Sequence, residues 1–350
     1  MTTIYDIAKA AGVTATTVSY VLSGKDGVSQ ATRERVMKYV QELGYRPNLV
    51  ARSLTKQSTS TIGLVVPNIG NPFYAGLAQV VERIAYEAGF RLFITNTYRD
   101  DNLGQDLLSD LMSRRIDGAI VMSDGLSSKT LQALQTKTSQ SFPIVRCLME
   151  YDEQGTGPSI RFDFFAAGRL AGEHLLQLGH QRIGVITDGV STDGIIFERI
   201  RHPLRLAGFR EALAQGGYPL SPSFLRIGDS SLETGKEVAY QLLQLPTPPT
   251  AIFATNDLMA LGVISAAWEL GVHVPQRLSV VGFDDIRLAA YYIPPLTTVI
   301  MREATIAEQA LDLLFAMIEG KEVSSPPMLQ PTLVIRESTA PLWKEAEQPS

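Results

Sequence analysis

The sequence predicts two folded parts, a small all-α helix-turn-helix headpiece at the N-terminus and a larger α/β domain of two doubly wound subdomains. Three observations support this fold class. Capped helical segments fill residues 3–43, short apolar strands alternate with helical stretches from residue 61 onward, and basic residues concentrate at the N-terminal end. With 350 residues, 45% of them hydrophobic, the chain is too long for one typical domain and can bury a large core.

The headpiece begins with a helix that starts at Thr3. Thr3 and Asp6 have the spacing of a capping box, in which a hydroxyl and a carboxylate satisfy free N–H groups at the helix start. Gly12 makes a tight corner, because glycine tolerates backbone conformations that other residues resist. Thr14 then caps a second helix that ends near Leu22. The apolar residues of the first helix are Ile7, Ala8 and Ala11.

The second and third helices complete the predicted core. The inward positions of the second helix are Val18, Val21 and Leu22, which leaves Ala15, Thr16, Ser19 and Tyr20 facing outward. Such an outward face would lie in a DNA major groove. A third helix over residues 29–43 adds the helically spaced residues Val36, Val40 and Leu43.

A helical bundle that binds no DNA is the alternative interpretation of the headpiece, since capped helices joined by a glycine turn are common. The distribution of charge argues against it. Residues 1–60 hold eight Lys or Arg and four Asp or Glu, a net of +4, whereas the whole chain carries −5, so the remainder carries −9. Basic surface confined to one small end is typical of phosphate binding.

Residues 47–60 are predicted to form a hinge segment. Pro47 fixes its start, Asn48 can cap, and residues 49–55 could make about two helical turns, well short of the ~12–15 residues that an isolated helix needs in water. The hinge segment should therefore stay disordered until binding orders it. By spacing alone, Leu54 could pack on Val50 as an ordinary helix residue.

The large domain shows strands at regular intervals. Alternation of strands and helices over roughly 280 residues argues for two parallel, doubly wound sheets. Ligands of open α/β sheets sit beyond the carboxyl ends of strands, so two facing subdomains would bind one between them. The strand candidates span residues 62–66, 92–95, 119–122, 144–148, 183–187, 252–254 and 280–283.

Several motifs closely resemble the LacI/GalR family of bacterial repressors. They are TIYDIAKAAGVTATTVSYVL at 3–22, GYRPNLVARSL at 44–54, IGLVVP at 62–67, NPFY at 71–74, DGAI at 117–120, LGH at 178–180, RLAGF at 205–209, NDLMA at 256–260, VGFDD at 281–285 and PPLTT at 294–298. The resemblance covers nearly the whole chain and implies an effector domain like the periplasmic sugar-binding proteins, with crossovers near Phe162, Ala290 and Leu329.

The resemblance also sets the expected domains. These are the headpiece (1–46), the hinge helix and linker (47–60), an effector-binding and dimerisation domain (61–340) and a disordered tail (341–350). The N-subdomain spans about 61–161 and 291–328, and the C-subdomain about 162–290 and 329–340. In the family, paired hinge helices lie in the minor groove and a leucine from each wedges open a base step, a position that Leu54 matches. The implied DNA-binding residues are Thr3, Tyr5, Thr14, Ala15, Thr16, Thr17, Ser19, Tyr20, Asn48, Ala51, Arg52 and Leu54.

Candidate effector-binding residues follow the predicted strands. Phe73 and Tyr74 would offer an aromatic wall, Arg199, Arg201 and Arg205 are expected in the loop after strand 183–187, and Asn256 and Asp284 follow later strands. Amide, carboxylate and guanidinium groups suit a polyhydroxylated ligand, because each hydroxyl can donate and accept.

Structural roles are the alternative for these residues: helix N-caps for Asn256 and Asp284, and a solvated loop for the arginines. The resemblance favours Arg205, Asn256 and Asp284, Arg199 less, and Arg201 least. Asp163 is also a candidate, but it lies in Phe162-Asp163-Phe164, where relatives commonly have an Asp-Asn pair. Residues 190–196 look longer than usual, which leaves the effector's identity open.

Other protein classes fit the sequence poorly. It has no Cys-x-x-Cys, His-Glu-x-x-His, Gly-x-Ser-x-Gly or phosphate-binding glycine loop, so no enzyme, cofactor or metal is expected. His174 and His180 are expected at the surface or as caps. The single cysteine, Cys147, excludes an internal disulfide, and without a signal peptide or an apolar run of ~18–20 residues we expect a cytoplasmic protein with no membrane partner.

The prediction is therefore a ligand-responsive, homodimeric repressor that binds a pseudo-palindromic DNA operator, with a small sugar or sugar derivative as effector. Two alternatives remain at this point. One is the same architecture with a nucleobase or other non-sugar corepressor. The other is a nonspecific architectural DNA-binding protein, which would not need a large acidic domain.

Overall fold

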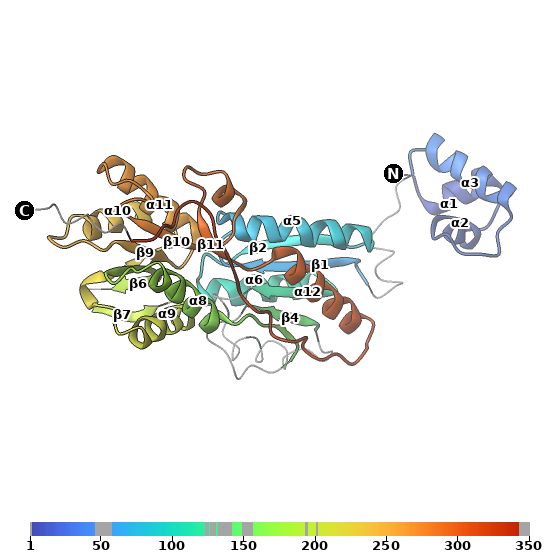
Figure 1. The fold of residues 1–350 in the computed structure, drawn as a ribbon. Coiled ribbons are helices and arrows are strands. Elements are labelled where there is room, and N and C mark those ends of the chain that lie inside the picture. The colour runs from blue at the N-terminus through green and yellow to red at the C-terminus, as the bar shows by residue number, and fades with distance from the viewer. Residues whose placement is uncertain are drawn as a thin grey trace, which may run out of the picture. The chain divides into compact units, whose positions relative to one another are not determined.

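The computed structural model describes residues 2–45, 58–122, 126, 131, 142–148, 157–192, 195–200 and 202–342. The chain divides into two compact units, Met1–Thr59 and Ser60–Ser350 (Figure 1). The first contains three helices among its described residues, and the second contains two sheets with helices packed against them.

The headpiece consists of α1 (Ile4–Ala11), α2 (Ala15–Leu22) and α3 (Gln30–Glu42). The capping box at Thr3 is confirmed: the Asp6 amide donates to the Thr3 hydroxyl, and the Thr3 amide donates to the Asp6 carboxylate at 2.8 Å. Thr14 caps α2 as predicted. The buried core residues are Ile7, Ala8, Ala11, Val18, Val21 and Val36.

Two headpiece positions differ from the prediction, Leu43 fully and Ala15 in part. Leu43 is 41% exposed, because α3 ends at Glu42 and Leu43 is its C-terminal cap, outside the core. Ala15 is half-buried and packs against the headpiece core, because it is the first residue of α2 and lies close to the corner between α1 and α2.

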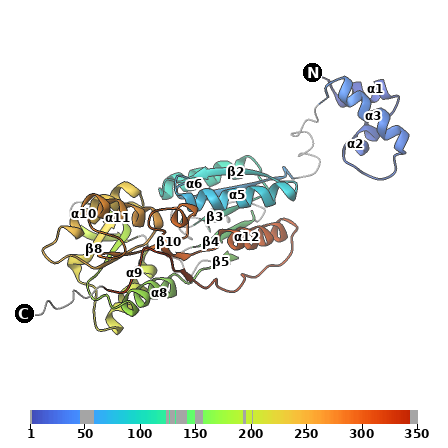
Figure 2. The same cartoon turned by 45° about the horizontal axis from the view of Figure 1, so that its top comes forward.

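The first lobe of the large unit is built on a parallel sheet of five strands in the order β2-β1-β3-β4-β5. Apolar β1 residues such as Leu64 pack with α5 (Pro72–Glu87), whereas Val65 packs with α6 (Asp101–Ser113), so both faces of the sheet are covered. Helix α12 (Glu303–Ile318) returns to this lobe beside α5 (Figure 2). The strands are β1 (Thr61–Val66), β2 (Arg91–Asn96), β3 (Gly118–Met122), β4 (Ile144–Cys147) and β5 (Ser159–Ile160).

The second lobe is built on a seven-stranded sheet in the order β12-β11-β10-β9-β6-β7, with β8 paired to β6. Strands β7 and β12 pair antiparallel with their neighbours, and the others pair parallel. The strands are β6 (Ile183–Thr192), β7 (Ile195–Ile200), β8 (Leu225–Gly228), β9 (Ala251–Ala254), β10 (Ser279–Asp284), β11 (Thr297–Ile300) and β12 (Thr332–Val334). The helices are α8 (Phe164–Gln177), α9 (Pro203–Gln215), α10 (Leu232–Leu243) and α11 (Asp257–Glu269), with short 3-10 turns η1 (Pro222–Phe224) and η2 (Arg287–Ala290).

Helices α8 and α9 approach each other so closely that only glycine fits at their crossing. A Cβ atom added to Gly168 would lie 1.9 Å from the carbonyl oxygen of Arg205, and one added to Gly208 would lie 1.9 Å from that of Phe165. Both obstacles are backbone atoms, which cannot move aside as a side chain can. The two glycines therefore fix the position of α9, which carries Arg205, relative to α8.

The chain passes between the lobes where residues 161–163 meet Leu329. Phe162 and Leu329 form a parallel bridge, the Leu329 amide donates to the Arg161 carbonyl at 2.8 Å, and the Asp163 amide donates to the Leu329 carbonyl at 3.0 Å. Two crossing segments are thus hydrogen-bonded to each other.

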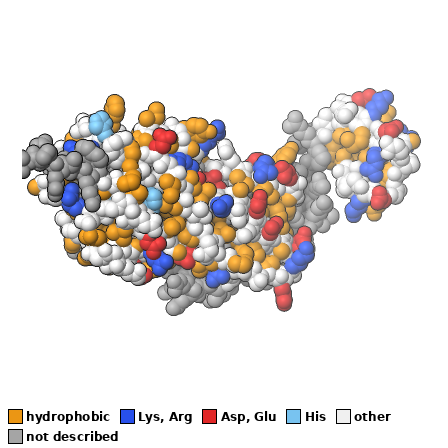
Figure 3. All heavy atoms as spheres, in the orientation of Figure 1, with side chains coloured by type: hydrophobic (Ala, Val, Ile, Leu, Met, Phe, Trp, Pro, Cys, Tyr) orange, Lys and Arg blue, Asp and Glu red, His pale blue; other side chains and the backbone are white. Residues whose placement is uncertain are grey.

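The surface mixes side chains of all kinds. On the face drawn in Figure 3, acidic and basic side chains of the large unit are interspersed with apolar ones. Within the described parts of the chain, we find no helix with the length and apolar character that a membrane crossing requires.

Candidate functional site

The outward face of α2 is the first candidate site. Tyr20 is 41% exposed, and Thr16 and Ser19 are also exposed. The Lys25 ammonium lies 5.4 Å from the centre of the Tyr20 ring. Arg33 of α3 donates to the carbonyl of Val21 in α2 at 3.3 Å and to that of Lys25 after the helix at 2.9 Å, which fixes the end of α2 to α3. The surface therefore offers hydroxyl groups and an aromatic ring on α2, with a cation from the segment that follows this helix.

The other predicted DNA-binding residues divide into three sets. Thr14 and Thr17 are joined at the start of α2 by a 2.9 Å contact between their hydroxyls. Thr3 is bonded to Asp6, and Tyr5 is 73% exposed. The candidates of the hinge segment lie outside the described residues; they are Asn48, Ala51, Arg52 and Leu54.

In the large unit, Arg205 and Asp284 lie next to each other at the carboxyl ends of strands β9 and β10 of the second lobe. Arg205 was expected in a loop, but it belongs to α9, because Pro203 starts this helix just after His202. Its Nη1 donates to the Thr255 carbonyl at 2.7 Å and lies 3.9 Å from Asp284 Oδ1. Both side chains are buried.

Two aromatic rings hold the Arg205 guanidinium in place. Its central carbon lies 3.8 Å from the centre of the Phe283 ring and 4.7 Å from that of Phe164. A cation over ring faces is attracted by the negative charge of the π-system, and more strongly when water is excluded. Arg205 is therefore preorganised, and it requires no ligand to reach this position.

Asp284 has an unusual electrostatic environment. Burial raises its pKa to about 7, against the lowering effects of the Arg205 charge and of a hydrogen bond from the Asn71 side chain, and the nearby Glu303 raises it further. Burial likewise raises the pKa of Glu303 to about 7. Asp284 is the last residue of β10, with a φ of 117°, so the alternative that it caps a helix is wrong.

The helix-cap alternative is correct for Asn256. Its Oδ1 accepts from the Met259 amide at 2.8 Å at the start of α11, and its Nδ2 donates to the Ser230 carbonyl at 3.4 Å. Asp163 is also a cap, since its carboxylate accepts from the Ala166 amide at 2.8 Å. These two side chains thus have structural partners within the second lobe.

The remaining candidates are dispersed. Phe73 is only 1% exposed and belongs to the main hydrophobic core, whereas Tyr74 is half-buried beside it, with ring centres 5.2 Å apart. Arg199 is expected in a loop but belongs to β7, because residues 195–200 form a strand that pairs antiparallel with the end of β6. Arg201 lies outside the described residues.

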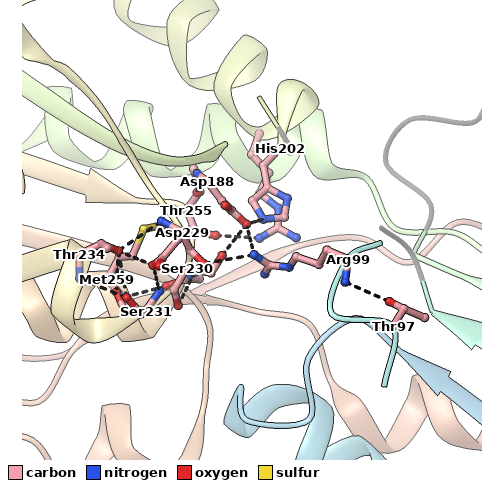
Figure 4. A network of polar contacts seen from close by, with 12 residues as sticks. Thr97, Arg99, Asp188, His202, Asp229, Ser230, Ser231, Thr234, Thr255 and Met259 are labelled. Carbon is pink, nitrogen blue, oxygen red and sulfur yellow. Dashed lines mark hydrogen bonds and ion pairs between the residues drawn. The ribbon is translucent and has the colours of Figure 1, made fainter. Parts of the chain in front are cut away.

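Sequence reasoning missed a polar network around Asp188 (Figure 4). This fully buried carboxylate lies 2.7 Å from Arg99 Nη1 and accepts from the Ser230 hydroxyl at 2.6 Å. His202 Nε2 lies 3.8 Å from the same carboxylate oxygen. The sequence held a signal, because Asp188 directly follows the strand predicted over 183–187, at its carboxyl end.

His174 and His180 are neither surface residues nor helix caps, contrary to expectation. Both are buried; His180 contacts the Ser279 hydroxyl at 2.9 Å and the Ala340 carbonyl at 3.1 Å, and His174 contacts the Thr339 hydroxyl at 3.1 Å. Burial lowers the pKa of both imidazoles. They anchor the C-terminal segment on the second lobe, which sequence spacing did not indicate.

Comparison with known proteins agrees with this architecture. Residues 3–48 match the family described as bacterial regulatory proteins, lacI family, and residues 173–339 match a periplasmic binding protein-like domain. The chain is 35% identical to the HTH-type transcriptional repressor PurR of Mannheimia succiniciproducens over 97% of its length and 98% of that protein. It is 38% identical to the HTH-type transcriptional regulator DegA of Bacillus subtilis, over 97% of this chain and 99% of that protein.

Solved structures give the same result. The Lac repressor dimer bound to operator and the anti-inducer ONPF matches 97% of this chain and 99% of its own, with a TM-score of 0.84 and 29% identity. A LacI-family regulator from Enterococcus faecium with bound ribose matches 81% of this chain and 100% of its own, with a TM-score of 0.71 and 28% identity.

A helix-turn-helix unit joined to a two-lobed α/β unit defines the class of ligand-responsive transcriptional repressors. The chain belongs to the lacI family of bacterial regulatory proteins. The curated relatives named above are transcriptional regulators rather than enzymes.

Proposed function

We propose that this protein is a homodimeric repressor of a two-fold symmetric operator, and that a neutral, hydroxyl-rich molecule of the sugar class controls it from a site between the lobes. The observation that carries this proposal is the buried, preorganised pair of Arg205 and Asp284. A guanidinium offers only donors and a carboxylate offers acceptors, so together they match hydroxyl groups that do both.

The charges around this pair favour a neutral ligand over an anion. Arg99 and Arg205 face the acidic groups Asp188, Asp284 and Glu303. An anionic effector would meet these carboxyl groups in a poorly solvated site, where like charges repel most strongly. The ribose bound by the E. faecium relative is a ligand of the class that we propose.

On the DNA side, we propose that Thr16, Ser19 and Tyr20, with Ala15 beside them, read base edges in the major groove. Leu54 of the hinge segment would act as the wedge in the minor groove. Movement of the lobes would change the separation of the two hinge segments in a dimer. The hinge segments would then switch between an ordered, DNA-binding state and a disordered state.

The effector site can be tested by separating ligand binding from DNA binding. A thermal-shift screen of the full chain with neutral sugars, sugar phosphates and nucleobases first identifies the class of stabilising compound. Arg205→Ala and Asp284→Ala should then each reduce affinity for that compound about 5- to 150-fold by calorimetry, because a buried partner is left unpaired. Arg114→Ala, which removes an exposed arginine at the C-terminal cap of α6, is the matched control.

Operator affinity measured without ligand should change less than about twofold in the same variants, because Arg205 and Asp284 belong to the large unit. A parallel loss of ligand and operator affinity would show that the two residues are structural. Stabilisation by nucleobases or sugar phosphates alone would contradict the sugar class.

Base reading has its own test. Exchange of Ala15, Thr16 and Tyr20 should change the preferred half-site, at about 1–3 kcal/mol for each mismatched base pair. Selection from a random DNA library before and after the exchange measures the preference. An unchanged selected sequence would mean that other residues read the bases.

A further inference from the structure

A buried ion pair joins the two lobes. Arg99, from the turn between β2 and α6, places Nη1 2.7 Å from Asp188 Oδ2, and the two side chains are only 10% and 0% exposed. The same nitrogen donates to the Asp229 carbonyl at 3.2 Å. One side chain of the first lobe therefore binds two segments of the second, β6 and the turn between β8 and α10 (Figure 4).

The turn that carries Arg99 is built to hold this position. Tyr98 and Arg99 have φ values of 50° and 63°, a left-handed conformation that is unfavourable for residues other than glycine. Such residues persist where surrounding contacts determine the backbone. Here the Arg99 amide donates to the Thr97 hydroxyl at 3.2 Å, and the Thr97 amide donates to the Val66 carbonyl at 2.9 Å.

Asp188 is held equally well from the other side. Its carboxylate accepts from the Ser230 hydroxyl, and its amide donates to the Thr255 hydroxyl at 3.3 Å. Both of these bonds lie within the second lobe, so they would survive a separation of the lobes. Only the contacts with Arg99 would break, and both charged groups would then regain water.

We propose that the Arg99–Asp188 ion pair is a latch that holds the two lobes together when no effector is bound. Because desolvation offsets much of the attraction in a buried pair, the latch is expected to bias the closed state without locking it. Loss of a charged hydrogen bond should lower the ratio of closed to open molecules roughly 10- to 100-fold.

Single-molecule FRET on the full chain tests the latch without DNA or ligand, so its failure is distinguishable from failure of the proposed function. Dyes on Ser109→Cys of α6 and Glu237→Cys of α10, both exposed, report the distance between lobes, and the buried Cys147 should not be labelled. An excess of unlabelled chain ensures that a dimer carries at most one labelled chain, so the two dyes report on the same chain.

Arg99→Met should shift the population toward the longer distance, and Arg99→Asp should shift it further because it faces Asp188 with a like charge. Asp188→Asn should have a large effect in the parent but less than about a twofold effect in the Arg99→Met background, as expected for residues that act through one contact. Arg114→Met, which removes an exposed ion pair with Asp110 in the same lobe, is the matched control and should leave the distances unchanged.

If Arg99→Met fails to fold by circular dichroism, Arg99→Lys replaces it; the shorter side chain keeps the charge and should give a smaller shift in the same direction. Distances like those of the parent in the folded Arg99 variants would overturn the latch. An equal shift in Arg114→Met would overturn it as well, since any loss of positive charge would then have the same effect.

Discussion

Gly168→Ala should destabilise the second lobe, although helix propensity alone predicts the opposite. Gly168 lies inside α8, where alanine is favoured over glycine by about 1 kcal/mol. The added methyl group, however, would lie 1.9 Å from the Arg205 carbonyl oxygen. Overpacking costs about 1–3 kcal/mol or more when neighbours cannot repack, and here the neighbour is backbone. With the cost at or above the upper end of this range and about 1 kcal/mol regained from helix propensity, we expect a net loss of about 2 kcal/mol or more.

Thermal unfolding followed by circular dichroism measures the effect. For a unit of nearly 300 residues, about 1 kcal/mol corresponds to roughly 2 °C, so Tm should fall by about 4 °C or more. The control is Gly216→Ala, whose methyl group meets the tip of the Leu176 side chain at 2.7 Å, a group that can move. Equal Tm values for Gly168→Ala and the parent would refute the argument that these helices touch through their backbones.

Three further predictions concern pH, the hinge segment and the headpiece. Burial raises the pKa of Asp284 to about 7, so the folded chain keeps a proton that the unfolded chain releases near pH 4. The free energy of unfolding of the parent should therefore fall as pH rises from about 4 to 7, by on the order of 4 kcal/mol at most, and that of Asp284→Asn should fall less. Urea unfolding measures both; the same pH dependence for parent and variant would contradict a raised pKa at Asp284. Leu54→Ala should weaken operator binding strongly but leave salt-dependent binding to unrelated DNA, because phosphate contacts persist and only the bend is lost; operator affinity equal to the parent's by fluorescence anisotropy would exclude the wedge. Thr3→Ala should lower the stability of the headpiece by about 1 kcal/mol through loss of the α1 cap, measured by urea unfolding of the full chain, and no change would mean that the capping box contributes nothing in solution.

Much of the fold could be predicted from local patterns. Long apolar strands such as β1 and β10 were identified because both faces of a parallel sheet are buried and the run of apolar residues is continuous. The missed strands are short or carry polar residues. β11 contains Thr297 and Thr298, whose hydroxyls bond to the half-buried Thr339 and the buried Asp257, and only the tertiary structure provides those partners. The missed strands are β5, β7, β8, β11 and β12.

The candidate site was less predictable because it depends on contacts distant in sequence. Asp284 lies at the end of β10, as its position after a strand predicts, since parallel strands end at one edge of the sheet; its neighbour Arg205 comes from α9 and not from the expected loop. Position alone could not show that Asn256 is committed to a helix start, or that Arg99 crosses to Asp188, 89 positions away in the sequence. A pairing of this kind requires the relative placement of two lobes, which no local pattern contains.

The bonded crossover between Phe162 and Leu329 limits how the lobes can move. Two extended segments joined by hydrogen bonds on both sides of one residue can bend and twist together, but they cannot slide past each other without breaking those bonds. The bridge therefore favours rotation of the lobes about it over sliding of one lobe past the other. The Asp163 amide donates to the Leu329 carbonyl, and the Asp163 carboxylate caps α8, so the start of this helix would stay attached to the bridge when the lobes rotate. Small rotations there would be magnified into larger displacements at the far ends of the lobes.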